Sequence, residues 1–199
     1  MRMIDKQQTP DRIAELLVHV GRAARSETGQ SDLTAAQWSC LRFFARANRS
    51  TRTPSGFASF QATTRGTASQ IVKSLEMRGL VVRQTSERDR RSFCFDLTEP
   101  GRAMLDRDPL HDLVLAIDDL GTAEGDRFLE TLSRLASGLA LRKAGPAFGT
   151  CRDCSHFAAS GGMAYCACMS AELTASEIDK LCASYRGPIH PKTEGKRQE

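Results

Sequence analysis

Five of the seven cysteines in this 199-residue chain lie beyond residue 150. Residues 151–168 read CRDCSHFAASGGMAYCAC, and a further cysteine follows at Cys182. The spacing is Cys-x2-Cys-x11-Cys-x-Cys-x13-Cys, which offers the four thiolates that a tetrahedral zinc ion or an iron–sulfur cluster requires. An odd number of clustered thiols favours metal or redox chemistry over structural disulfides.

We expect four of these cysteines to be metal ligands, namely Cys151, Cys154, Cys166 and Cys182, with Cys168 as an alternative to Cys166. His156 is expected to be a surface residue rather than a ligand. A segment this short buries too little apolar surface to fold unaided, so metal–thiolate bonds would stabilise it. Three possibilities stay open: a 4Fe–4S cluster, a structural zinc ion, or a metal-free thiol switch.

Counted through Cys166, the pattern becomes Cys-x2-Cys-x11-Cys-x15-Cys. Together with Phe157 after the first pair and Tyr185 after the last cysteine, it resembles the cluster-binding segments of high-potential iron–sulfur proteins. That resemblance implies a 4Fe–4S cofactor. The Thr174-x-x-Glu177 pattern also predicts a capped helix, whose apolar face would carry Ile178, Leu181, Cys182 and Tyr185.

The rest of the chain has the composition of a globular protein, with 40% apolar and 26% charged residues. No apolar run is long enough for a membrane span, and the N-terminus lacks the apolar core of a signal peptide. We therefore expect a cytoplasmic protein with no membrane partner. Gly145, Pro146 and Gly149 mark a linker, which divides residues 1–144 from a cysteine-rich extension at 145–199.

Residues 1–144 are predicted to be mostly helical with one small β-hairpin. Amphipathic periodicity and capping residues predict helices over 10–27, from Thr34, from Pro54, over 64–78 and from Thr98. A longer helical stretch over 109–143 is interrupted near Gly121. β-branched and aromatic residues predict strands at 80–83 and 92–97, joined by the arginine-rich segment QTSERDRR.

Charge and helix pattern together indicate a polyanionic partner. Residues 34–100 contain eleven Lys or Arg residues against five Asp or Glu residues, a net charge of +6. The helix over 64–78 has an apolar stripe on one face and only short polar or cationic side chains on the other. A helix–turn–helix followed by a two-stranded wing places such a face in the DNA major groove, while arginines at the wing tip reach phosphates or the minor groove.

The motifs LTAAQW, TASQIVKSLEMRGLVVR, DRR and LTEPG follow one another at the order and spacing of a known family. Over about residues 10–143 the chain resembles the MarR family of winged-helix regulators. The resemblance implies a homodimer that binds a pseudo-palindromic operator on double-stranded DNA, mostly as a repressor. It also implies a set of DNA-contacting residues, namely Arg65, Thr67, Ser69, Gln70 and Lys73 in the helix and Arg88, Arg90 and Arg91 in the wing.

The sequence therefore predicts a DNA-binding transcriptional regulator whose operator affinity is controlled by an iron–sulfur cluster that senses redox state, oxygen or iron. Cluster binding would order the tail against the long helices, which set the distance between the two recognition helices. The alternative is a repressor with structural zinc that responds to a small ligand. No paired carboxylates, phosphate loop or nucleophile motif is present, so we do not expect an enzyme.

Overall fold

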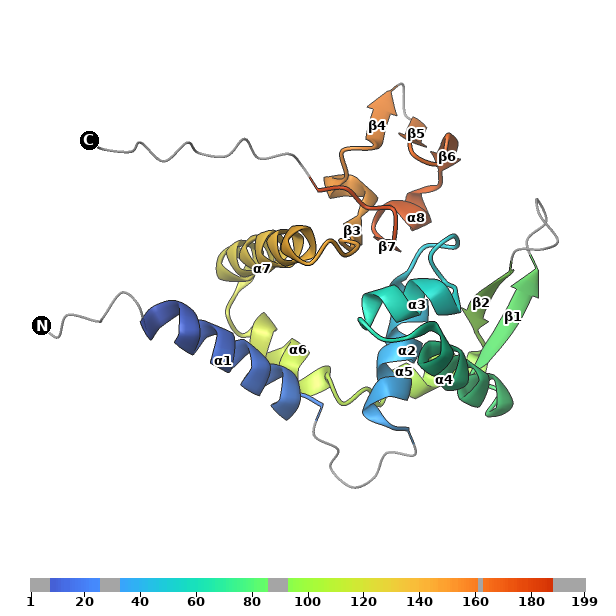
Figure 1. Cartoon of the computed structure of the whole chain (residues 1–199), viewed down its shortest axis with the longest axis horizontal. Coiled ribbons are helices and arrows are strands. Elements are labelled where there is room, and N and C mark those ends of the chain that lie inside the picture. Colours follow the sequence, from blue (N-terminus) through green and yellow to red (C-terminus); the bar gives the residue numbers. More distant parts are fainter. Residues whose placement is uncertain (1–7, 26–32, 86–92, 161–162, 188–199) are drawn as a thin grey trace, which may run out of the picture.

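The computed structural model describes residues 8–25, 33–85, 93–160 and 163–187 (Figure 1). The chain begins with α1 (Gln8–Ala23) and continues into a winged helix made of α2 (Ala35–Arg46), α3 (Pro54–Phe60), α4 (Arg65–Met77), β1 (Val81–Thr85) and β2 (Phe93–Leu97). Then come α5 (Glu99–Leu105), α6 (His111–Asp118) and α7 (Thr122–Arg142). The predicted mostly helical fold with a small β-wing is confirmed, although α1 begins two residues before Pro10.

Threonine caps fix where the helices of the winged helix begin. The hydroxyl of Thr34 accepts a hydrogen bond from the Gln37 amide, and the Gln37 side chain accepts one from the Thr34 amide, which completes the predicted capping box. The hydroxyls of Thr53, Thr64 and Thr98 each accept one hydrogen bond from a first-turn amide of α3, α4 and α5. Helix α4 ends at Met77, and two residues later the chain turns away at Gly79, whose φ of +69° suits glycine best.

One hydrophobic core lies between α2, α3, α4 and the wing. Phe44 stacks on Phe95 of β2 with ring centroids 5.7 Å apart, and Phe43 lies 5.7 Å from Phe57 of α3. Helix α4 turns Ala68, Val72 and Leu75 into this core, and its other face stays outside. The core therefore fixes the orientation of α4 relative to the wing.

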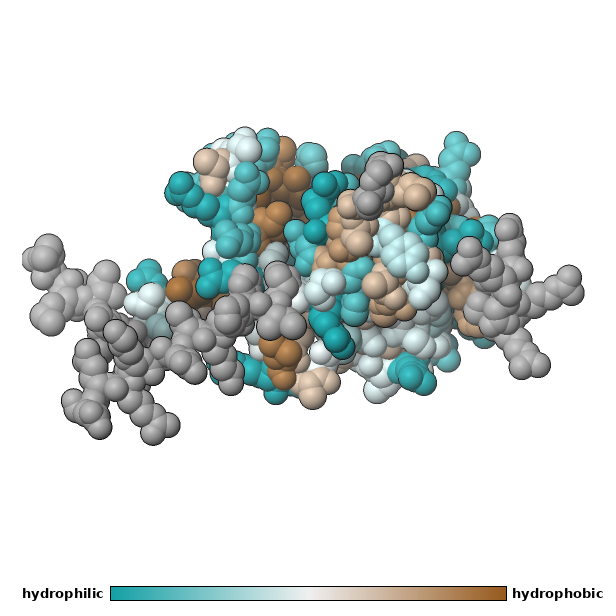
Figure 2. Space-filling view, turned by 90° about the horizontal axis from the view of Figure 1, so that it is seen from above, coloured by the Kyte–Doolittle hydropathy of each residue, from teal (hydrophilic) through white to brown (hydrophobic). Residues whose placement is uncertain are grey.

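Helices α1, α6 and α7 lie to one side of the winged helix (Figure 1). Among the described residues of α6 and α7, none is buried. Large hydrophobic side chains remain exposed along these helices, among them Leu16, Val20, Leu129, Leu135 and Leu139. Figure 2 shows such hydrophobic side chains at the surface of this helical part. None of the described helices is long and apolar enough to cross a membrane.

The described part of the tail forms two small sheets. Strand β3 (Gly149–Thr150) pairs antiparallel with β7 (Leu181–Cys182), and β4 (Phe157–Ser160), β5 (Met163–Cys166) and β6 (Ala171–Leu173) form a three-stranded antiparallel sheet. A short 3-10 turn, η1 (Cys151–Asp153), and the single-turn helix α8 (Ala175–Ile178) connect them.

The predicted tail helix through Cys182 is wrong. Helix α8 ends at Ile178, and the Thr174 hydroxyl contacts the Ser176 hydroxyl at 3.0 Å rather than capping the helix. The reason is tertiary: Leu181 and Cys182 pair with β3, and Leu181 also bridges to Ala47 at the end of α2. These contacts hold the backbone extended where local periodicity favours a helix.

Candidate functional site

The outer face of α4 carries the predicted base-reading residues. Arg65, Thr67, Ser69, Gln70 and Lys73 are all exposed, whereas Ala68, Val72 and Leu75 on the opposite side are buried. Amides and hydroxyls on such a face hydrogen-bond to base edges, and cations contact phosphates. Thr67 is partly engaged already, because its hydroxyl lies 2.9 Å from that of Thr64. Assignment of these residues to DNA contact stays a prediction.

The described part of the wing adds a cation that the sequence analysis did not single out. The Arg83 guanidinium lies 3.8 Å above the centroid of the Phe93 ring, a cation–π contact across the two strands. Arg83 is exposed on β1, so it extends the basic surface from α4 towards the wing tip. The predicted tip residues Arg88, Arg90 and Arg91 lie outside the described residues.

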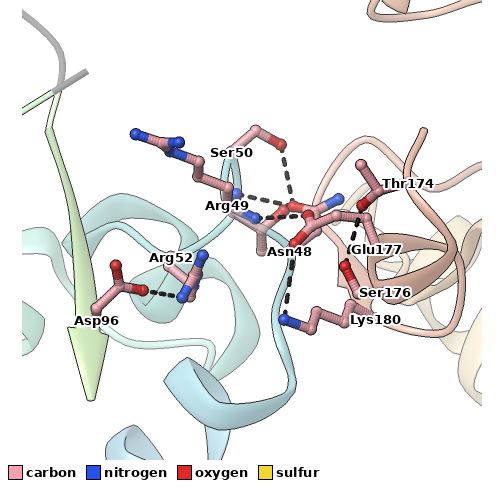
Figure 3. A network of polar contacts seen from close by, with 10 residues as sticks. Asn48, Arg49, Ser50, Arg52, Asp96, Thr174, Ser176, Glu177 and Lys180 are labelled. Carbon is pink, nitrogen blue, oxygen red and sulfur yellow. Dashed lines mark hydrogen bonds and ion pairs between the residues drawn. The ribbon is translucent and has the colours of Figure 1, made fainter. Parts of the chain in front are cut away.

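The base of the wing is fastened to the loop that joins α2 to α3, residues 47–53. The Phe95 amide donates to the Arg52 carbonyl at 2.8 Å, and the Arg52 side chain forms an ion pair with Asp96 (Figure 3). Both side chains are largely shielded from solvent. The position of this loop therefore constrains strand β2.

Burial separates the five tail cysteines into two groups. The side chains of Cys151, Cys166 and Cys182 are buried and Cys154 is half-buried, whereas Cys168 is exposed on the turn after β5. Burial, and then the nearby thiols of Cys182, Cys166 and Cys154, raise the pKa of Cys151 to about 11. The other three predicted ligands thus lie near Cys151, whereas the alternative Cys168 is exposed.

Short backbone pairings bring these thiols together. Cys182 lies opposite Gly149 in the β3–β7 ladder, and Cys166 lies opposite Phe157 in the β4–β5 ladder. The Arg186 amide donates to the Cys154 sulfur at 3.5 Å. Within the described residues, however, no three His, Cys, Asp or Glu side chains are arranged to hold a metal ion. The metal ligands therefore stay a prediction.

Tyr185 closes one side of this cysteine group. Its ring lies so close to Gly149 that a Cβ there would be 2.6 Å from two ring carbons, so a side chain at position 149 would displace the ring. Burial, followed by the charges of Asp153 and Cys154, raises the pKa of Tyr185 despite its hydrogen bond with Ser137 of α7. Tyr185 thus connects the cysteine group to the longest helix.

The tail also docks on the α2–α3 loop, a contact that the sequence analysis missed (Figure 3). The Glu177 carboxylate accepts a hydrogen bond from the Arg49 amide at 3.0 Å. Two further bonds flank Cys182, from the Asn48 amide to the Leu181 carbonyl at 2.8 Å and from the Ala183 amide to the Thr51 hydroxyl at 2.9 Å. No local sequence signal marks contacts between residues more than 120 positions apart.

One family model and several solved regulators are similar to parts of this chain. Residues 31–92 match the model of the MarR family. The regulator BldR from Sulfolobus solfataricus is 24% identical, with a TM-score of 0.50 over 69% of this chain and 99% of its own. FabT from Streptococcus pneumoniae, solved in complex with DNA, is 21% identical, with a TM-score of 0.49 over 68% of this chain and 97% of its own. The repressor CouR, solved on a 23-mer DNA duplex, is 26% identical, with a TM-score of 0.49 over 68% and 98%.

No curated protein matches the chain. The family match and the likeness to BldR both support a winged-helix fold. The match to the MarR family model covers residues 31–92, the part of the chain that contains α2, α3, α4 and β1.

Proposed function

We propose that this chain is a homodimeric repressor that binds a pseudo-palindromic operator and whose affinity is controlled by a 4Fe–4S cluster in its tail. One observation carries the DNA-binding half: α4 buries Ala68, Val72 and Leu75 and exposes Arg65, Ser69, Gln70 and Lys73 on its outer face. Two such faces, one from each protomer, would read two half-sites one helical turn apart.

Exposed apolar side chains support the homodimer. Helices α1, α6 and α7 present Leu16, Val20, Leu135 and Leu139 to solvent, and a second copy of the same helices is the partner that covers such a face symmetrically. Replacing Leu16 and Val20 together with glutamate should give monomers in sedimentation experiments. A dimer that survives this double change would place the interface elsewhere.

The donor set supports a cluster. Four thiols lie near one another, three of them buried, and the Arg186 amide donates to the sulfur of Cys154. Hydrogen bonds to cysteine sulfur are among the features that tune iron–sulfur centres. When bound, the cluster would supply reversible one-electron chemistry and sensitivity to oxygen. The protein's own part is to hold Cys182 through the β3–β7 ladder and to shield the site with Tyr185.

Metal analysis of protein purified without air tests the proposal. We expect about four iron and four sulfide ions per chain and absorbance near 400 nm, as a 4Fe–4S centre gives. Removing the cluster should change the affinity for the protein's own promoter while leaving the weaker binding to scrambled DNA unchanged. Zinc alone would favour a structural site and a separate inducer, and a metal-free native protein would overturn the cofactor assignment.

A further inference from the structure

We infer that β7 couples the cysteine group directly to the DNA-reading elements of the same protomer, by clamping the α2–α3 loop from both sides of Cys182. This inference rests on the proposed function and names how its regulation would work. The sequence predicts that the tail acts on DNA binding through the long helices. The contact between the tail and the α2–α3 loop is a shorter connection from the cysteine group to the DNA-reading elements.

The first step is the clamp itself. Leu181 accepts from the Asn48 amide and Ala183 donates to the Thr51 hydroxyl, so the residues before and after Cys182 are both bonded to one loop. These partners are well enclosed, with Asn48 7% and Thr51 2% exposed. Because backbone bonds on either side of a residue fix its direction, the placement of the Cys182 thiol and of the loop depend on each other.

Glu177 and Phe148 add further contacts between the tail and the winged helix. The Glu177 carboxylate accepts from the Arg49 amide, while its other oxygen lies 3.6 Å from the Lys180 ammonium. Where the tail leaves α7, the Phe148 ring lies edge-on to Phe60 at 5.2 Å and to Phe43 at 6.3 Å. The tail is thus held to the winged helix near Phe148 and again near Glu177.

The second step leads from the loop to the wing and α3. Arg52, next to Thr51, accepts from the Phe95 amide and pairs with Asp96, so two interactions join the loop to β2. The Thr51 carbonyl lies against Gly56 of α3 so closely that no Cβ fits there. A displaced Thr51 therefore shifts the wing and the first helix of the helix–turn–helix together.

The consequence is a switch inside one protomer. While Cys182 is held as a ligand, β7 stays extended and the loop keeps the wing in place. Release of Cys182 frees β7 and with it the loop, so the wing loses its fixed orientation towards DNA. The hydrogen bond between Tyr185 and Ser137 adds a second contact from the same segment to α7.

Removing the clamp without touching a cysteine tests this inference. Thr51→Val keeps the side-chain shape but removes the acceptor for the Ala183 amide. In the whole chain with its metal bound we expect unchanged metal content and faster amide exchange in residues 93–97. We also expect the ratio of operator affinities with and without the cluster to fall from the 5- to 150-fold range of typical couplings to below about threefold.

Two further variants make the test decisive. Glu177→Ala removes the acceptor for the exposed Arg49 contact and should act in the same direction even where Thr51→Val folds poorly. Arg152→Ala breaks an exposed ion pair with Asp179 at 2.8 Å that lies wholly within the tail, so it should behave like the parent protein. Parent-like exchange of residues 93–97 in both Thr51→Val and Glu177→Ala overturns the inference, whatever the metal content. A native protein without metal overturns the proposed function instead.

Discussion

The guanidinium of Arg42 in α2 lies 2.7 Å from the carboxylate of Asp108, between α5 and α6. Both side chains are largely buried, with 11% and 15% exposed. The same carboxylate oxygen accepts a 2.8 Å hydrogen bond from the Leu110 amide at the start of α6. This pair therefore fixes the point at which the chain leaves the winged helix for the helices α6 and α7.

Removal of one member of this ion pair should lower the free energy of unfolding. Asp108→Ala leaves the Arg42 charge enclosed without a partner, and we expect the free energy of unfolding to fall by about 3 kcal/mol, as when a buried ion pair loses one side. Replacing both residues with Arg42→Met and Asp108→Leu should restore most of the loss. Urea unfolding of the three proteins measures this, and a change below about 0.5 kcal/mol in Asp108→Ala would show that the pair is effectively solvated.

Glycine at position 101 is required by close contact rather than by its backbone angles. A Cβ at Gly101 would meet the carbonyl of Leu80, where α5 crosses the start of the wing. We expect Gly101→Ala to lower the free energy of unfolding by about 1–3 kcal/mol through overpacking. The matched control is Gly125→Ala in α7, where nothing lies within 4 Å of the new Cβ and helix propensity predicts a gain of about 0.5–1 kcal/mol. Equal effects in the two variants would contradict the close contact.

The winged helix was predictable because its signals are local. Thr34 with Gln37, Pro54 and Thr98 with Pro100 are helix-start patterns that act through the first turn alone, and each marks a helix in the structure. Helix α4 likewise has one apolar stripe that only a single orientation can bury. These patterns fix both the elements and the face of α4 that remains outside.

The tail could not be predicted from local signals because distant contacts decide it. Thr174 and Glu177 have the spacing of a capping box, yet the Glu177 carboxylate is bonded to the Arg49 amide, 128 positions away. The choice between Cys166 and Cys168 depends on the β4–β5 register, which places Cys166 opposite Phe157. Spacing alone leaves both cysteines possible.

Substitution in α4 should change specificity rather than general affinity. An amide side chain in the major groove pairs with an adenine edge, so Gln70→Ala should cost about 1–3 kcal/mol at one operator position and leave binding to scrambled DNA unchanged. Competition binding with single-base operator variants measures this discrimination. Glu76→Ala, exposed on the same helix, serves as the control and should not alter base preference. A uniform loss across all sequences in Gln70→Ala would mean that this residue contacts the backbone.

The two neighbouring cysteines of the tail should differ in their importance. Cys166 is buried beside the other thiols, whereas Cys168 is exposed. We therefore expect Cys166→Ser to lose bound metal and Cys168→Ser to keep the full content, because a ligand must face the site. Iron and zinc analysis of the two purified variants decides the matter. Loss of metal in Cys168→Ser alone would reverse the ligand assignment.

The buried thiol of Cys40 in α2 should make the free energy of unfolding fall as the pH becomes alkaline. Cys40 is fully enclosed, and desolvation by burial raises the pKa of its thiol far above the ordinary value of about 8.5. At a pH below that ordinary value the thiol is neutral in both the folded and the unfolded chain. The free energy of unfolding therefore keeps its full value there. Above it, the unfolded chain releases the proton while the folded protein retains it, and stability falls by up to about 1.4 kcal/mol per pH unit. Unfolding measured at pH 7, 9 and 10.5 should therefore show a steeper alkaline decline for the parent than for Cys40→Ala. Equal slopes would mean that this thiol also ionises in the folded protein.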